Sequence, residues 1–184
     1  MTLTTPTKIW TYDDLFALPD DGKRYEIIHG ELYEMPSPNF VHATAIINLI
    51  MMLGPVAMKL GGILRTAPLA VFIKNGNPVQ PDIIVLLADR LHLSSSRGIE
   101  GAPSLLIEIL SPSNSEHDRL TKRELYARAG VLEYWLVSPE AAIVEVLTLD
   151  GKTYRTHVRA GVDELVTSPL LPDLSFSASA VFAM

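Results

Sequence analysis

The chain of 184 residues carries a formal net charge of −6, with 48% hydrophobic and 20% charged residues. This balance predicts a globular protein rather than a disordered one, and the length suits one compact domain over residues 1–184. The sequence contains no cysteine, which excludes disulfides, thiolate metal ligands and a cysteine nucleophile. The acidic balance counts against non-specific nucleic-acid binding through a broadly basic surface.

The hydropathy pattern argues against a membrane protein. The longest near-apolar stretch, residues 43–60, contains Asn48 and Lys59 and predicts a buried helix rather than a membrane span of roughly 20 apolar residues. The first residues lack the basic and apolar pattern of a secretory signal. We therefore expect a cytoplasmic protein with no membrane partner.

The N-terminal third predicts a short helix, a hairpin and a long helix. Thr11 suits the N-terminal cap of a helix over residues 11–17. Residues 25–28 and 31–35 are two strand-like runs on either side of Gly30. They predict a hairpin with that glycine in its turn. Apolar residues at helical spacing predict a helix over residues 39–60, which a glycine pair ends.

The middle of the chain predicts strands separated by turns. Residues 63–74 predict one or two strands, closed by Asn75-Gly76, and Asp82 opens a strand over residues 83–87. A polar loop is expected over residues 89–103. Residues 105–110 then form a run that is apolar on both sides, which is typical of a strand in the middle of a covered sheet.

The C-terminal part predicts one more helix and three strands. After a turn-rich loop over residues 111–115, a helix is expected over residues 116–129, and a strand over 133–137 is expected to lie parallel to the 105–110 strand. Asp150-Gly151 predicts a hairpin turn. This order of elements predicts an α/β (α+β) domain with a central mixed β-sheet flanked by helices.

Glu108 is the residue in this pattern that most needs an explanation, because it interrupts the doubly apolar strand. An ionised carboxylate buried alone there would cost several kcal/mol of desolvation. A cation, a hydrogen-bond network or a raised pKa must therefore compensate it. Asp82 opens a neighbouring apolar strand and Lys122 follows on the next helix, so the three side chains form a candidate catalytic site.

A divalent metal ion would suit this group. Mg²⁺ or Mn²⁺ prefers oxygen ligands and needs only one or two carboxylates, here Asp82 and Glu108, with the backbone carbonyl of Ile109. Lys122 could orient the attacking water and offset negative charge in the transition state. Two structural alternatives stay open: Asp82 could bond nearby amides at a strand start, and Glu108 and Lys122 could form a buried ion pair without chemistry.

Three further residues are candidates for supporting roles. Asp118 lies four residues before Lys122 and so on the same helix face, although this spacing also fits an ordinary surface pair. Glu31 and His42 could enter the same cleft as an extra ligand or a proton carrier. The alternatives are a paired strand acid and a histidine that merely begins a helix.

A basic patch is possible on the helix that carries Lys122. Arg119, Arg123 and Arg128 accompany it there and could contact phosphate despite the acidic chain. The alternative is an ordinary solvated helix face.

With these residues in view, the sequence resembles the Uma-type restriction endonuclease family, a bacterial group within the PD-(D/E)XK nuclease superfamily. The resemblance covers nearly the whole chain and is most specific in a central block. The matching stretches are residues 25–32, Pro36-Ser-Pro38 with His42, Gln80-Pro81-Asp82, residues 101–113, Asp118, Lys122, Tyr126, residues 129–135 and residues 168–172.

The resemblance implies a restriction-endonuclease-like fold and cleavage of DNA that depends on Mg²⁺ or Mn²⁺, with Asp82 and Glu108 as metal ligands. The superfamily places a lysine two residues after the second acid, where this chain has Leu110; the resemblance implies that Lys122 replaces it. It also implies Glu31 as an additional acid and, because related nucleases often pair, a homodimer. The acidic pI and Leu110 motivate an alternative, a non-catalytic module that keeps the nuclease fold and binds nucleic acid or a protein.

Overall fold

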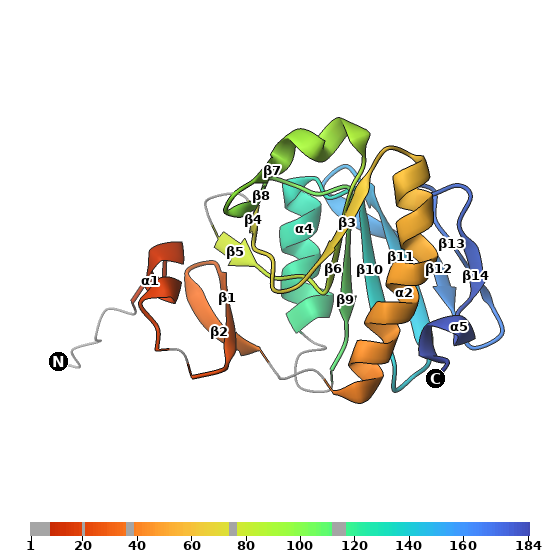
Figure 1. Cartoon of the computed structure of the whole chain (residues 1–184), viewed down its shortest axis with the longest axis horizontal. Helices are drawn as coiled ribbons and strands as arrows, with labels where there is room; N and C mark the ends of the chain where they lie inside the picture. Colours follow the sequence, from red (N-terminus) through yellow and green to blue (C-terminus); the bar gives the residue numbers. More distant parts are fainter. Residues whose placement is uncertain (1–7, 20, 36–38, 74–76, 112–116) are drawn as a thin grey trace.

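The computed structural model describes residues 8–19, 21–35, 39–73, 77–111 and 117–184. Its centre is a six-stranded sheet of order β12-β11-β10-β9-β6-β3 (Figure 1). In that order the strands span Thr153–Ala160, Ile143–Asp150, Glu133–Ser138, Leu105–Ile109, Ile83–Leu86 and Ile63–Thr66. β9 and β10 run parallel and every other neighbouring pair runs antiparallel, which confirms the predicted mixed sheet and its parallel pair.

The two faces of the sheet alternate along β9, the central strand. Leu105 and Ile107 lie in the apolar core on one face, beneath helix α2 (Phe40–Lys59). Leu106 and Leu110 lie in the core on the other face, beneath helix α4 (Arg123–Ala129). Side chains two apart on a strand share a face, so Glu108 points toward α4.

Helix α2 is capped by Asn39, whose side chain accepts a hydrogen bond from the His42 backbone N–H at 2.9 Å. Its buried side packs on the sheet through Ala45, Leu49, Leu53 and Ala57. Among the described helices, α2 is long and apolar enough to cross a membrane, judged by length and composition alone. The sequence predicted a buried helix, but in this fold α2 buries only one side against the sheet and keeps its other side exposed.

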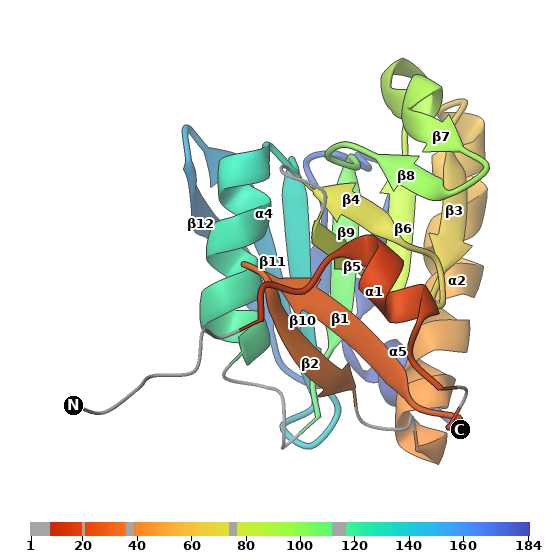
Figure 2. The same ribbon diagram turned by 90° about the vertical axis from the view of Figure 1, so that its left-hand side faces the viewer.

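The N-terminal segment forms a separate layer in front of α4 and the strands (Figure 2). Helix α1 (Tyr12–Phe16) carries the predicted cap, because the Thr11 side chain accepts from the Asp14 backbone N–H. Strands β1 (Arg24–Ile28) and β2 (Glu31–Met35) form the predicted hairpin. Its two turn residues, His29 and Gly30, both have positive φ, 53° and 81°, as tight hairpin turns require.

The expected loop over residues 89–103 contains regular structure instead. It holds the 3₁₀ helix η1 (Ala88–Leu93) and the short strands β7 (Ser94–Ser95) and β8 (Gly98–Glu100). These strands join β4 (Val71–Ile73) and β5 (Asn77–Val79) in a second sheet of order β5-β4-β8-β7. Gly98 permits the pairing, since a Cβ there would lie 2.2 Å from the Ala70 carbonyl oxygen. These strands were not predicted because residues 94–100 are largely polar and the strands pair through their backbones.

The C-terminal segment adds two strands and a helix that the sequence pattern did not predict. Strands β13 (Leu165–Thr167) and β14 (Ser175–Ser177) pair with each other, and helix α5 (Ser179–Phe182) lies beside α2 (Figure 1). Two expected turns, at Asn75-Gly76 and residues 112–115, fall outside the described residues, as does the stretch Pro36-Ser-Pro38.

Buried Glu133 ties this segment to the sheet. Its carboxylate accepts from the Ser168 hydroxyl at 2.8 and 3.0 Å, from the Leu170 N–H at 2.7 Å and from the Trp135 indole N–H at 2.9 Å. Leu171 and Leu174 then lie in the core, which agrees with the expectation that this stretch covers the core.

Candidate active site

Glu108 is buried at the α4 face of β9 and is compensated by two direct partners. Its Oε1 atom lies 3.0 Å from the Lys122 Nζ and accepts the Tyr126 hydroxyl at 2.8 Å. All three side chains are at most 3% exposed. The structure therefore supplies both the cation and the hydrogen bond that the sequence required of a buried acid.

Lys122 lies at the centre of three carboxylates. Its Nζ is 2.9 Å from Glu26 Oε2, 3.0 Å from Glu108 Oε1 and 3.2 Å from Asp118 Oδ1. Asp118 and Lys122 bound the π-helical turn η2 (Asp118–Lys122), which leads directly into α4. Such turns often occur at functional sites. We call Glu26, Glu108, Asp118 and Lys122 the lysine cluster.

Glu26 is the member that sequence reasoning missed. It comes from β1 in the hairpin layer, is fully buried, and accepts the Gln80 backbone N–H through Oε1 at 2.6 Å. This bond joins the hairpin to the segment that carries Asp82. The signal available in the sequence was the same as for Glu108, an acid inside the otherwise apolar run of residues 25–28.

The lysine cluster holds more acids than cations. Three carboxylates share one ammonium, so two negative charges remain if all of them ionise. Burial raises the pKa of Glu108 well above its ordinary 4.5 and also raises the pKa of Asp118. Burial alone would lower the pKa of Lys122, but the carboxylates of Glu108, Glu26 and Asp118 raise it well above 10.5. The cluster therefore favours a bound proton or a further cation.

Asp82 adjoins the cluster from β6. Its Oδ2 atom accepts the Ile109 N–H at 2.8 Å, directly after Glu108 in the chain, and its Oδ1 atom lies 3.0 Å from His42 Nε2. In the antiparallel register Ile83 pairs with Ile107, so Asp82 stands opposite Glu108 one step further along. Asp82, Glu108 and Lys122 thus lie at the same end of the sheet.

Part of this site suits a divalent cation. The surplus negative charge of the three carboxylates around Lys122 favours one. Within the described residues, no group of three or more His, Asp or Glu side chains has the geometry of a metal site. Asp82 and Glu108 are carboxylates of the kind that Mg²⁺ takes as oxygen ligands.

The other expected site residues lie in different surroundings. Glu31 is exposed and accepts the Tyr33 hydroxyl at 2.8 Å, while Glu26 fills the position of an additional acid in the lysine cluster. His42 is linked to the site through Asp82.

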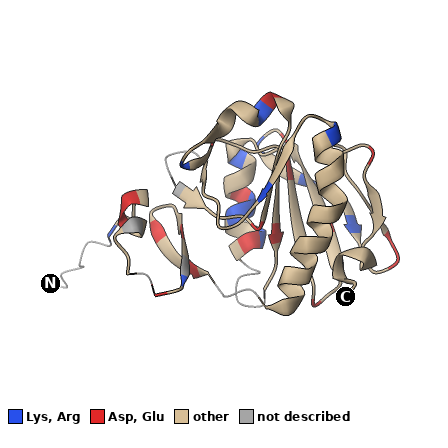
Figure 3. Ribbon diagram, in the orientation of Figure 1, with Lys and Arg blue, Asp and Glu red and all other residues tan. Residues whose placement is uncertain are grey.

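The basic helix divides into two sides. Lys122 turns into the lysine cluster, whereas Arg119, Arg123 and Arg128 remain partly or fully exposed. Basic and acidic residues both occur along η2 and α4 (Figure 3).

Comparison with known proteins gives the chain a family and a fold. The model of a family described as "Uma2: Putative restriction endonuclease" matches residues 12–179. Among solved structures, the chain is similar to one titled as a putative nuclease belonging to DUF820 from Anabaena variabilis. That similarity has a TM-score of 0.77 and 23% sequence identity, and it covers 94% of this chain and 97% of the other. No curated protein matches the chain significantly.

Proposed function

The chain belongs to the Uma2 family, and from this membership we propose that it is an endonuclease that hydrolyses DNA phosphodiester bonds with Mg²⁺ or Mn²⁺. The observation that carries the proposal is the surplus of buried carboxylates around Lys122, with Asp82 beside them. Buried ion pairs are poor stabilisers, so a cluster with unbalanced charge needs a reason other than stability. Nuclease chemistry at this end of the sheet is such a reason.

Asp82, Glu108 and the Ile109 carbonyl would hold the metal ion. When bound, the ion would polarise the scissile phosphate and lower the pKa of a bound water. Asp82 is positioned for this role by His42 on one oxygen and by the Ile109 N–H on the other.

Lys122 and its neighbours set the charge of the site. The ammonium offsets the negative charge that a phosphate would bring to the carboxylates. Tyr126 fixes Glu108 by donating to its Oε1 atom, and Asp118 and Glu26 hold the ammonium beside it. Lys122 thus takes the part of the lysine that the superfamily carries at the position of Leu110.

Cleavage assays test this proposal. Wild type is expected to nick supercoiled DNA or cut single-stranded DNA with Mn²⁺, and Glu108→Gln is expected to lose this activity. Glu133→Gln is the matched control, because it neutralises another buried acid that lies in a different network. Equal cleavage by wild type and Glu108→Gln would reject the assignment.

Metal binding is tested separately by calorimetry with Mg²⁺ and Mn²⁺. Uptake by wild type that is lost in Asp82→Ala and retained in Glu133→Gln supports the assigned ligands. Circular dichroism and thermal unfolding of each variant separate loss of a ligand from loss of the fold. Uptake that is unchanged in Asp82→Ala would contradict the role of this residue.

A second candidate is a binding module that keeps the nuclease fold without catalysis. The closure of the lysine cluster favours it, because Lys122 is fully buried and already occupies the space between three carboxylates. This candidate predicts DNA or protein binding with no metal uptake and no cleavage. The calorimetric titration above therefore decides between the two.

We also propose that the protein is cytoplasmic and that two copies of it pair through α2. Its outward side carries Ile47, Met51 and Met58, which are 57%, 71% and 72% exposed. Exposed apolar residues aligned along one helix are typical of an interaction surface. Met51→Glu is expected to shift sedimentation from dimer to monomer, and Lys59→Glu at the end of the same helix is the charge control. A monomeric wild type would refute the pairing.

A further inference from the structure

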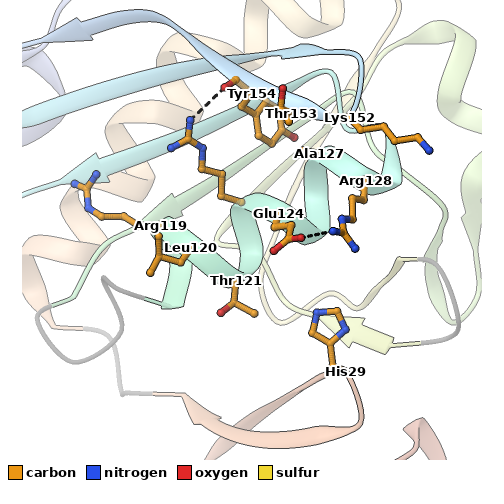
Figure 4. A pocket seen from close by; sticks show the side chains of 11 residues that line it. His29, Arg119, Leu120, Thr121, Glu124, Ala127, Arg128, Lys152, Thr153 and Tyr154 are labelled. Carbon is orange, nitrogen blue, oxygen red and sulfur yellow. Dashed lines mark hydrogen bonds and ion pairs between the residues drawn. The ribbon is translucent and has the colours of Figure 1, made fainter.

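A cavity of about 1030 Å³ lies on the solvent side of η2 and α4, away from the lysine cluster. Its walls come from the β1–β2 turn, from η2 and α4, and from the start of β12 (Figure 4). We call it the basic pocket, because four of its lining residues are Arg119, Arg123, Arg128 and Lys152. His29, held at the tip of the hairpin turn, faces the helix from across the pocket (Figure 4).

The basic pocket contrasts in charge with the rest of the chain. Its lining has four permanent cations and one acid, Glu124, whereas the whole chain has a net charge of −6. Glu124 pairs with Arg128, and that pair is exposed, with side chains 62% and 66% accessible. An exposed pair of this kind contributes little and is readily replaced by a stronger anionic partner. A net positive charge therefore remains for a ligand.

The pocket arginines keep most of their donors available. Among the described residues, Arg119 forms one ion pair, with Glu145 at 3.3 Å, and Arg123 donates once, to the Tyr154 carbonyl at 3.2 Å. A guanidinium has five N–H donors in a fork that matches two phosphate oxygens. The contacts just named orient each side chain and leave the remaining donors for a ligand.

The same stretch of helix serves the lysine cluster and the basic pocket. Asp118 and Lys122 point into the cluster, and the residues that follow each of them, Arg119 and Arg123, line the pocket. A group bound in the pocket is therefore held on the reverse side of the segment that presents the lysine. The pocket and the proposed reaction centre therefore lie on opposite sides of one helical segment.

We propose that the basic pocket binds the phosphodiester backbone of the nucleic-acid substrate and positions it for cleavage. The proposal rests on the proposed nuclease function and adds the surface that holds the substrate. Arg119 and Arg128 are nine residues apart, or about 14 Å along a helix axis, which is the rise of about four nucleotides in one strand. This row of cations suits a chain of phosphates better than a single anion.

Direct binding of fluorescently labelled DNA tests the proposal without any cleavage. Anisotropy is measured in EDTA with a 20-base-pair duplex and with one of its strands, at several salt concentrations. Arg128→Gln/Lys152→Gln removes two exposed pocket charges. It is expected to weaken binding about 10- to 100-fold at 0.1 M salt and to reduce the slope of log K against log salt by about 2.

The matched control is Lys59→Gln/Arg65→Gln, which removes two exposed charges at the opposite edge of the sheet. It is expected to bind DNA like wild type. Equal binding by the pocket variant and wild type, or an equal loss in the control, would overturn the proposal. So would a wild type that does not bind DNA at low salt. An acidic peptide that competes as well as DNA would also overturn it, because the pocket would then not select phosphate.

The outcome can be separated from failure of the proposed function. If Glu108→Gln binds DNA like wild type and the pocket variant does not, the pocket holds substrate whether or not the chain cleaves it. If wild type cleaves DNA in a Glu108-dependent way but the pocket variant binds normally, the nuclease assignment stands and the pocket assignment fails.

Discussion

Two buried acids on neighbouring parallel strands are satisfied in opposite ways. Glu133 on β10 shares a face with Trp135 and receives hydrogen bonds from neutral donors, a hydroxyl, an indole and a backbone N–H. Glu108 on β9 lies on the other face and depends on Lys122, which it shares with two other carboxylates. Glu133 fastens the C-terminal segment to the sheet, whereas Glu108 belongs to an unbalanced group of charges.

The difference shows how a structural acid can be told from a candidate functional one. Burial does not separate them, because Glu133 and Glu108 are 2% and 3% exposed. Their hydrogen-bond and ion-pair partners separate them. Neutral donors satisfy the Glu133 carboxylate, whereas Glu108 and two other acids share one ammonium. A buried cluster in which acids outnumber cations contributes little to stability but is suited to binding cations or protons. Four experiments test this contrast.

Removing the shared cation should have the largest effect. Lys122→Met leaves three buried carboxylates without their ammonium, and we expect the free energy of unfolding to fall by about 3–5 kcal/mol at pH 7. Urea unfolding measures it. Lys59→Met, which breaks an exposed pair with Asp173, is the control and should change stability by less than about 1 kcal/mol. Coincident unfolding curves for Lys122→Met and wild type would contradict the dependence of the cluster on this lysine.

Removing one donor to each kind of acceptor compares charged with neutral hydrogen bonds. Tyr126→Phe deletes the bond to the Glu108 carboxylate, and we expect a loss of about 1.5–3 kcal/mol. Tyr154→Phe deletes a bond to the neutral Val131 carbonyl and should cost about 0.5–1.5 kcal/mol. Thermal and urea unfolding give both values. A larger loss in Tyr154→Phe would reverse the proposed ranking.

Changing the structural acid should affect stability without affecting chemistry. Glu133→Gln replaces one acceptor oxygen by an amide that faces a donor, so we expect a loss of about 1–3 kcal/mol. Metal uptake and DNA cleavage should stay at wild-type levels once the variant is folded. Glu124→Gln, at an exposed pair, controls for loss of charge. Loss of metal uptake in folded Glu133→Gln would remove the distinction between the two acids.

Changing Glu108 should have the smallest effect on stability at pH 7, within about 1 kcal/mol, because lost attraction to Lys122 is offset by relieved repulsion. The pH dependence of the stability difference between Glu108→Gln and wild type is a clearer test. The pKa of Glu108 is raised in the folded state, so above about pH 4.5 the folded chain holds more protons than the unfolded chain and wild-type stability falls as pH rises. Glu108→Gln should therefore gain stability relative to wild type as pH rises through this window. A constant difference from pH 4 to 8 would contradict the raised pKa.

The central sheet and three members of the site could be predicted because local pattern determines them. The doubly apolar run around Glu108 required a central strand. The helical segment that follows begins at the end of the sheet where this strand ends, so Lys122 lies near Glu108. Glu26 could not be assigned in this way. Its entry into the lysine cluster depends on how the hairpin packs against β5, which alternation along a strand does not encode.

The remaining differences have similar causes. The strands within residues 94–100 depend on backbone pairing permitted by Gly98 and leave little apolar pattern. The C-terminal strands depend on Glu133, a buried acid two of whose donors, Ser168 and Leu170, lie more than 30 residues away in the chain. Contacts of this range are set by tertiary packing rather than by local sequence.

The ion pair between Glu26 and Lys122 links the stability of the N-terminal hairpin to the charge state of the lysine cluster. A two-stranded hairpin is only marginally stable by itself, so the protection of its amide hydrogens from exchange with solvent depends on how firmly Glu26 is held. Uptake of a proton or a metal ion at the lysine cluster would change how firmly Glu26 is held. Hydrogen exchange along β1 and β2, far in sequence from Glu108, would then follow the ionic state of the site without any substitution.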